Sequence, residues 1–166
     1  GRVNWTFQTG QAIYAAPALD DKNLYIGSTD SNFYAINLKD GSLSWKFRIG
    51  TTQPGKFFSG AAVNGNKVLV GATDGCLYAF NKNSGELLWK FQTQAAISTS
   101  PVITDELAFV GSQDTYLYAV NLATGDSVWS FKTGGRIKTN PAMFGDYLIV
   151  ASEPKNVYAF KIETKP

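Results

Sequence analysis

The chain has 166 residues, of which 44% are hydrophobic and 17% charged, and its formal net charge is +2. This composition suits one globular domain, and the scattered Lys and Arg residues do not form the basic stripe that nucleic-acid binding requires. No apolar run approaches the ~20 residues that span a bilayer, so we expect neither a nucleic-acid partner nor membrane insertion.

A segment of similar sequence recurs along the chain. Its tryptophans are Trp5, Trp45, Trp89 and Trp129, and its Tyr-Ala pairs start at Tyr34, Tyr78, Tyr118 and Tyr158. A period of about 40 residues with four strand-like pieces per repeat is typical of a propeller blade. We therefore predict one all-β domain, residues 1–166, built as a β-propeller of four-stranded antiparallel blades. Its parts are an N-terminal strand 1–9, equivalent to the fourth strand of a blade, and repeats at about 10–49, 50–93, 94–133 and 134–166.

Each repeat begins with a strand rich in small residues. The four copies are Ile13–Leu19, Phe57–Val63, Ile97–Ile103 and Ile137–Met143. Three of them contain a proline, which lacks a backbone donor and is confined to sheet edges or strand starts. The second strand is almost continuously apolar, as expected for a strand covered on both faces. We expect the first strand to be the innermost edge of its blade.

Turn residues separate the remaining strands. Asp30, Asp74 and Asp114 follow the second strand and are expected to cap a turn through the backbone, with Pro154 in the fourth copy. The third strand carries the Tyr-Ala pair. A turn then closes with a glycine that can adopt a left-handed conformation, and these glycines are Gly41, Gly85 and Gly125. In the fourth strand, Trp and the following Phe are two residues apart and lie on one face.

The pieces add up to sixteen strands: one at the N-terminus, three groups of four, and a last group of three. This arrangement fits a complete small ring, a half-ring that pairs with another copy, or a fragment of a larger propeller.

The spans Ala35–Trp45, Ala79–Trp89 and Ala119–Trp129 share the pattern A-x-N-x-x-x-G-x-x-x-W. This pattern resembles the tryptophan-docking motif of the pyrroloquinoline quinone-type propeller repeat, A-x-D-x-x-T-G-x-x-x-W. The resemblance implies that Trp45, Trp89 and Trp129 pack between neighbouring blades near the Ala and Gly of the motif. Trp5 would then close or continue the array. The structural repeat residues are thus Trp5, Trp45, Trp89, Trp129, Gly41, Gly85, Gly125, Ala35, Ala79 and Ala119.

The resemblance implies two classes of function. One is a non-enzymatic scaffold or sensor propeller in the periplasm or outside the cell, with a protein partner. The alternative is a fragment of a quinoprotein dehydrogenase, which would use pyrroloquinoline quinone and calcium. That branch of the family needs carboxylate or Asn ligands, a catalytic Asp and often an adjacent Cys pair, and the sequence has none of these at matching positions.

No catalytic or metal site is evident, because the chain lacks histidine and its acidic residues fall in or beside predicted turns. Cys76 is the single cysteine, and we interpret it as a half-buried strand thiol. We therefore expect no enzyme activity and no cofactor under the first interpretation.

The copies differ most at the loop Thr51–Phe58, which is four residues longer than its counterparts. Loops on a rigid scaffold are where binding residues concentrate. Phe57 and Phe58 could form a partner-binding wedge, or one of them could enter the inner strand. Together with nearby cationic and aromatic residues they define the predicted partner-binding face, which comprises Tyr14, Lys56, Phe57, Phe58, Arg136 and Lys138.

Overall fold

The computed structural model describes residues 1–50 and 55–162, which contain fifteen strands and no helix. The strands form four sheets, which confirms the all-β class. Blade 1 comprises β1 (Ala18–Leu19), β2 (Asn23–Gly27), β3 (Asn32–Asn37) and β4 (Leu43–Arg48). Blade 2 comprises β5 (Ala61–Asn64), β6 (Lys67–Gly71), β7 (Cys76–Asn81) and β8 (Leu87–Gln92). Blade 3 comprises β9 (Val102–Ile103), β10 (Leu107–Gly111), β11 (Tyr116–Asn121) and β12 (Ser127–Lys132). Blade 4 comprises β13 (Ala142–Phe144), β14 (Tyr147–Ser152) and β15 (Asn156–Lys161).

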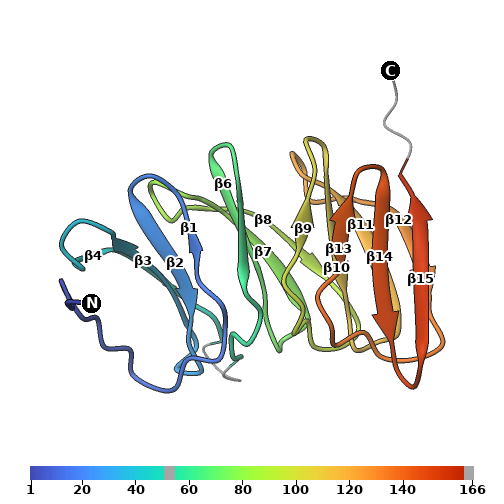
Figure 1. Ribbon diagram of the computed structural model, residues 1–166, viewed down its shortest axis with the longest axis horizontal. Coiled ribbons are helices and arrows are strands. Elements are labelled where there is room, and N and C mark those ends of the chain that lie inside the picture. The colour runs from blue at the N-terminus through green and yellow to red at the C-terminus, as the bar shows by residue number, and fades with distance from the viewer. Residues whose placement is uncertain (51–54, 163–166) are drawn as a thin grey trace.

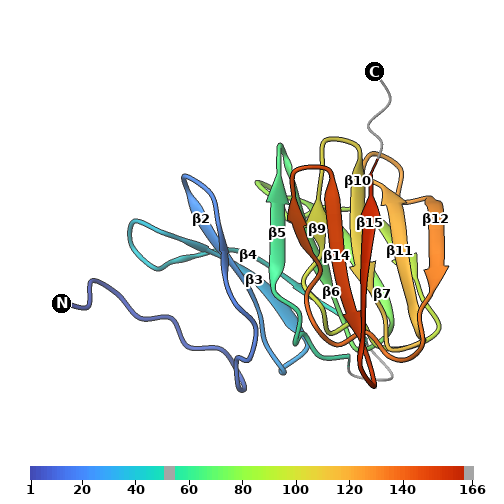
Figure 2. The same ribbon diagram turned by 45° about the vertical axis from the view of Figure 1, so that its right-hand side comes forward.

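Every blade is an antiparallel meander in which sequence neighbours pair. The four sheets follow one another along the longest axis of the molecule, with the N-terminus at one end and β15 at the other (Figure 1). The N-terminus and β15 are also well separated in the view turned by 45° (Figure 2). The molecule is thus a partial propeller, and the complete small ring is wrong, because blade 1 and blade 4 lie at opposite ends of the row of sheets (Figure 1).

The core lies between the blades. Successive side chains of each third strand point to opposite faces of the sheet and pack against different neighbours. In blade 1, Phe33 packs on Phe80 of blade 2, whereas Tyr34 packs on Phe7 of the N-terminal segment. Similar clusters join blade 2 to blade 3 and blade 3 to blade 4. Burial on both faces explains why the second and third strands are apolar at nearly every position.

The first strands are shorter than the sequence pattern indicates. β1, β9 and β13 each begin at the residue after a proline, namely Pro17, Pro101 and Pro141. Only β5, which begins at Ala61 where the other copies have the proline, extends to four residues. The missing proline N–H explains the late start of the ladder.

Residues 1–9 form no strand, contrary to the prediction, so the described residues contain fifteen strands rather than sixteen. A strand needs a paired neighbour, and blade 4, which has three strands among the described residues, lies at the other end of the molecule (Figure 1). Within the described residues there is no helix with the length and apolarity needed to cross a bilayer.

Candidate functional site

The tryptophans connect each blade to the next. The indole N–H of Trp45 donates to the backbone carbonyl of Lys82 at 2.9 Å, and that of Trp89 donates to Leu122 at 3.1 Å. Each indole lies over a glycine of the following blade: a β-carbon at Gly85 would be 2.6 Å from the Trp45 ring, and Gly125 faces Trp89 in the same way. The motif alanines Ala35, Ala79 and Ala119 are buried opposite these tryptophans across the strand pair.

Trp5 makes the same contacts at the front of blade 1, although its segment forms no strand. Its indole N–H donates to the carbonyl of Leu38 at 2.9 Å, and its ring lies over Gly41. Trp5 therefore continues the array at the front of blade 1 and does not close it onto blade 4.

Trp129 is more exposed than the other tryptophans of the motif, at 38% compared with 9% for Trp45 and Trp89. Its ring packs edge-on against Phe160 of blade 4 and lines an apolar pocket of about 340 Å³ with Leu107, Phe109 and Ile162. The residue that corresponds to Gly125 in the next repeat is position 165, which lies outside the described residues.

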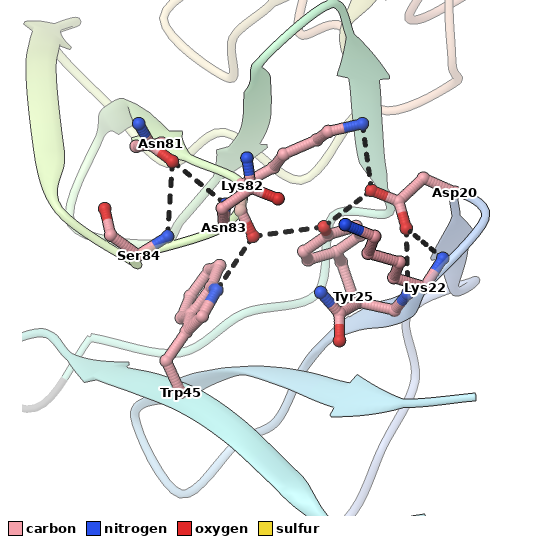
Figure 3. A network of polar contacts seen from close by, with 9 residues as sticks. Asp20, Lys22, Tyr25, Trp45, Asn81, Lys82, Asn83 and Ser84 are labelled. Atoms are coloured by element: carbon pink, nitrogen blue, oxygen red, sulfur yellow. Dashed lines mark hydrogen bonds and ion pairs between the residues drawn. The ribbon is translucent and has the colours of Figure 1, made fainter. Parts of the chain in front are cut away.

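The seam between blades 1 and 2 carries a polar network built around an ion pair (Figure 3). The ammonium group of Lys82 forms an ion pair with Asp20 at 3.0 Å, and both side chains are largely buried. The Tyr25 hydroxyl donates to Asp20 at 2.9 Å and lies 3.1 Å from the carbonyl of Lys82, the oxygen that also accepts from Trp45. Leu38 and Leu122 occupy the position of Lys82 in other copies.

Asp20 is held in its charged form. Burial pushes its pKa upward, but the backbone N–H groups of Asn23 and Lys22 and the side chains of Lys82 and Tyr25 outweigh burial and lower the pKa to about 2. Burial raises the pKa of Tyr25 above its usual range, so the phenol stays protonated and able to donate.

The depressed pKa makes the stability of the chain depend on pH. Asp20 stabilises the folded state fully above its unfolded pKa of about 3.8, and this contribution is lost as the pH falls toward about 2. We expect Asp20→Asn to lower the free energy of unfolding by roughly 2 kcal/mol at pH 6, and the difference from the wild type to vanish near pH 2. Urea unfolding at a series of pH values measures this difference. Asp21 is exposed, so Asp21→Asn is the control and should change the free energy of unfolding little at either pH. If Asp20→Asn lowered the free energy of unfolding equally at pH 6 and pH 2, the assignment to Asp20 would be contradicted.

The residues of the predicted partner-binding face do not lie together in one patch. Phe57 is fully buried between blades 1 and 2, where it fills the space left by the missing side chain of Gly27. It therefore cannot contact a partner. Neither Phe enters the inner strand either, since β5 begins only at Ala61; Phe57 is buried in the segment before it. Phe58 is 37% exposed and packs on Tyr14, which is 70% exposed, with 5.5 Å between ring centroids.

Backbone hydrogen bonds hold the loops that carry this aromatic pair. Thr73 exchanges two bonds with Lys56, one through its side-chain oxygen and one through its N–H, and Thr29 donates to Ala12 two residues before Tyr14. Residues 51–54 of the inserted loop lie outside the described residues. Lys56 is exposed and lies two residues before Phe58 in the sequence.

Arg136 and Lys138 belong to the corresponding loop of blade 4. Both are exposed, and the Lys138 ammonium group forms an ion pair with Glu153 at 2.9 Å. Among the described residues no hydrogen bond, ion pair or aromatic contact joins them to Tyr14 or Phe58. The six predicted residues thus separate into the aromatic pair of Tyr14 and Phe58 with Lys56 on the same loop as Phe58, a cationic group of Arg136 and Lys138, and the buried Phe57.

The turn aspartates have two roles. One carboxylate oxygen of Asp30, Asp74 and Asp114 accepts the backbone N–H two residues later, and the other accepts a tyrosine hydroxyl from the third strand. In blade 4, where Pro154 replaces the aspartate, the hydroxyl of Tyr158 itself accepts the N–H of Gly134 at 2.8 Å. The carboxylates of Asp30, Asp74 and Asp114 therefore stabilise the turns between the second and third strands.

Residues 1–50 and 55–162 contain no group of three or more His, Cys, Asp or Glu placed to hold a metal ion. The thiol of Cys76 is buried and donates to Gln92 at 3.0 Å, and burial raises its pKa. Cys76 is the single cysteine of the 166 residues, so they contain no adjacent pair of cysteines of the kind found in the quinoprotein branch.

Comparison with known proteins identifies relatives of this fold. The sequence matches the profile of the family described as "Outer membrane protein assembly factor BamB" over residues 1–57 and 48–164. A search of the curated proteins finds no significant match.

Solved structures share the fold at low identity. BamB from Moraxella catarrhalis superposes with a TM-score of 0.84 and 22% identity over 96% of this chain, which spans only 49% of that protein. The computationally designed Ika4 protein gives a TM-score of 0.84 at 17% identity, with 98% of this chain and 99% of that chain covered. The quinohemoprotein alcohol dehydrogenase ADHIIG from Pseudomonas putida HK5 gives 0.77 at 19% identity, with 95% of this chain and 34% of that chain covered.

Proposed function

Because the chain belongs to the family described as outer membrane protein assembly factor BamB, we propose that it is a non-enzymatic protein-interaction or scaffold propeller that acts in the periplasm or outside the cell. The location is supported by the family description, since that assembly takes place at an outer membrane. The interaction role is supported by one observation in particular, the exposed pair of Tyr14 and Phe58.

This pair has the properties of a recognition site. Aromatic side chains offer a large contact area at low cost in conformational entropy, and they are enriched where binding energy concentrates. The loops beneath are held by backbone bonds and anchored by the buried ring of Phe57. Lys56, two residues before Phe58, adds an exposed positive charge. We assign the partner-binding face to Tyr14, Phe58 and Lys56, with Arg136 and Lys138 as a separate cationic group on the loop of blade 4.

Removal of both exposed rings should abolish capture of the partner. We expect Tyr14→Ala/Phe58→Ala to fold normally, because both rings are substantially exposed, and to lose the proteins that the wild type retains from detergent-solubilised bacterial envelopes. Quantitative mass spectrometry of immobilised wild type and variant measures the loss. Phe144→Ala is the matched control, since it removes an aromatic ring that is 86% exposed on β13. Undiminished capture by the double variant would move the site elsewhere.

The dehydrogenase alternative makes a different prediction about the same protein. If the chain were part of such an enzyme, incubation with pyrroloquinoline quinone and calcium would produce bound quinone absorbance and alcohol-dependent reduction of a redox dye. Such activity would overturn the scaffold proposal.

A further inference from the structure

Four equivalent segments hold the exposed residues of the predicted partner-binding face. In each repeat, the segment that leads into the first strand accepts a backbone hydrogen bond from the turn between the second and third strands. The accepting residues are Ala12, Lys56, Ala96 and Arg136, and their donors are Thr29, Thr73, Gln113 and Glu153. We name residues 12–16, 56–60, 96–100 and 136–140 the inner segments. They enter the four blades from the same end, at the lower edge of Figure 1.

Side chains alternate along each inner segment between the interior and solvent. In blades 2, 3 and 4 the second residue is fully buried, and these residues are Phe57, Ile97 and Ile137. The residues on either side of this position are exposed or half-buried: Ala12 and Tyr14, Lys56 and Phe58, Ala96 and Ser98, Arg136 and Lys138. The inner segments therefore present two outer rows of side chains, and every exposed residue of the predicted partner-binding face belongs to them.

The rows continue from blade to blade, because the inner segments lie side by side. The Ser59 hydroxyl donates to the backbone carbonyl of Thr99 at 2.9 Å, and the backbone N–H of Ser100 donates to the side-chain oxygen of Asn140 at 2.8 Å. Each of these bonds joins residues at the same position of neighbouring repeats. One step along a row is thus no longer than a side chain, as the contact within the aromatic pair also shows.

The chemistry of the rows changes from blade 1 to blade 4. Blades 1 and 2 carry the two aromatic rings, and blade 4 carries two cations. Between them, blade 3 has only the short side chains of Ala96 and Ser98. The Ser98 hydroxyl accepts from the side-chain amide of Gln113 at 3.3 Å, so its own proton can be donated to a peptide carbonyl. A polypeptide backbone therefore has room to lie across blade 3.

The charge of the rows favours an acidic partner. The inner segments contain three cations, Lys56, Arg136 and Lys138, and no acid. Lys138 is paired with Glu153, and the other ion pair within residues 1–50 and 55–162 is that of Lys82, so Lys56 and Arg136 have no acidic partner there. Both partners of the Lys138 pair are exposed, and such a pair contributes little, so a carboxylate of a partner can replace Glu153.

We propose that the two rows bind one extended acidic segment of a partner protein. A large apolar side chain of the segment packs on Tyr14 and Phe58, its backbone crosses blade 3, and its carboxylates pair with Arg136 and Lys138. An extended chain advances about 3.3 Å per residue, so a few residues span the distance. The inference rests on the proposed function, since it names the chemistry of the partner at the same aromatic pair and adds the cationic group to that site.

Defined peptides test the preference for acidic residues. The probes are fluorescein-labelled peptides with Phe at one end, Gly and Ser in the middle and Asp at the other end, made in both chain directions. In the direction that binds more tightly, replacement of Asp by Asn should weaken binding about fivefold, as loss of two exposed ion pairs predicts. The difference should shrink at high salt, because exposed charges are screened. Fluorescence anisotropy measures the dissociation constants.

Three double variants locate the two halves of the site. Arg136→Gln/Lys138→Gln should remove the preference for Asp over Asn. Tyr14→Ala/Phe58→Ala should weaken binding of both peptides and keep their ratio. The matched control is Lys22→Gln/Lys39→Gln, which removes the same charge from two exposed side chains on turns at the opposite end of blade 1 and should leave both affinities unchanged.

Each contrary result has one meaning. Equal binding of the Asp and Asn peptides, or a preference for Asp that survives in Arg136→Gln/Lys138→Gln, would overturn the inference. An equal loss of this preference in Lys22→Gln/Lys39→Gln would also overturn it, because the net charge of the chain would then be responsible. If no peptide bound at millimolar concentration while capture from envelopes still required Tyr14 and Phe58, the acidic segment would be wrong and the proposed function would stand.

Discussion

Trp89→Ala is expected to lower the free energy of unfolding by about 3–5 kcal/mol, the range for truncation of a buried aromatic residue. The ring is 9% exposed, lies over Gly125, and donates through its N–H to the carbonyl of Leu122. The substitution would leave a cavity between blades 2 and 3 and a carbonyl without its donor. Denaturant unfolding followed by far-UV circular dichroism measures the loss.

Trp129→Ala is the matched control for this change. The residue has the same position in its repeat but is 38% exposed, so less apolar area is lost on truncation. Its loss should be clearly smaller than that of Trp89→Ala. Equal losses, or no effect of Trp89→Ala on the unfolding midpoint, would contradict the role of the indole as an inter-blade contact.

Gly85→Ala is expected to destabilise the chain by about 2–5 kcal/mol, because two costs add. The residue has a φ of 74°, a left-handed conformation that costs a side chain roughly 1–2 kcal/mol. Its new β-carbon would also lie 2.6 Å from the Trp45 ring, and overpacking of this kind costs typically 1–3 kcal/mol.

Gly145→Ala separates the two costs. Gly145 has a φ of 55° and no atom within 4 Å of its β-carbon position, so only the conformational cost applies there. Thermal and urea unfolding of both variants should show that Gly85→Ala loses more free energy of unfolding than Gly145→Ala. The difference between the two losses is the cost of the contact with the Trp45 ring. If the two variants were equally stable, the contact between Trp45 and Gly85 would not be tight.

Most of the architecture could be predicted from the sequence, because each repeat carries its own turn and strand signals. The tryptophan period located the blades, and the glycine of the motif located both the left-handed turn and the surface on which the indole lies. What the pattern of one repeat cannot specify is pairing between distant segments. Residues 1–9 have a fourth-strand sequence, yet they form no strand, since pairing depends on where blade 4 lies.

The candidate site was predicted less well. Periodicity alone could not decide which of Phe57 and Phe58 points inward, and the answer depends on the space at Gly27, thirty residues earlier. The network of Asp20, Tyr25 and Lys82 was missed, because its members come from two blades. The one available signal was that Lys82 replaces the leucine or isoleucine of the other copies.

The prolines before the first strands also affect how the open half-ring behaves in solution. These strands are edges of their sheets, and an exposed edge is a template for aggregation. Pro17 and Pro101 remove a donor from that edge and are followed by strands of only two residues, which offer few backbone groups to an incoming strand. The half-ring can thus expose its inner edges to water with little tendency to recruit other chains there.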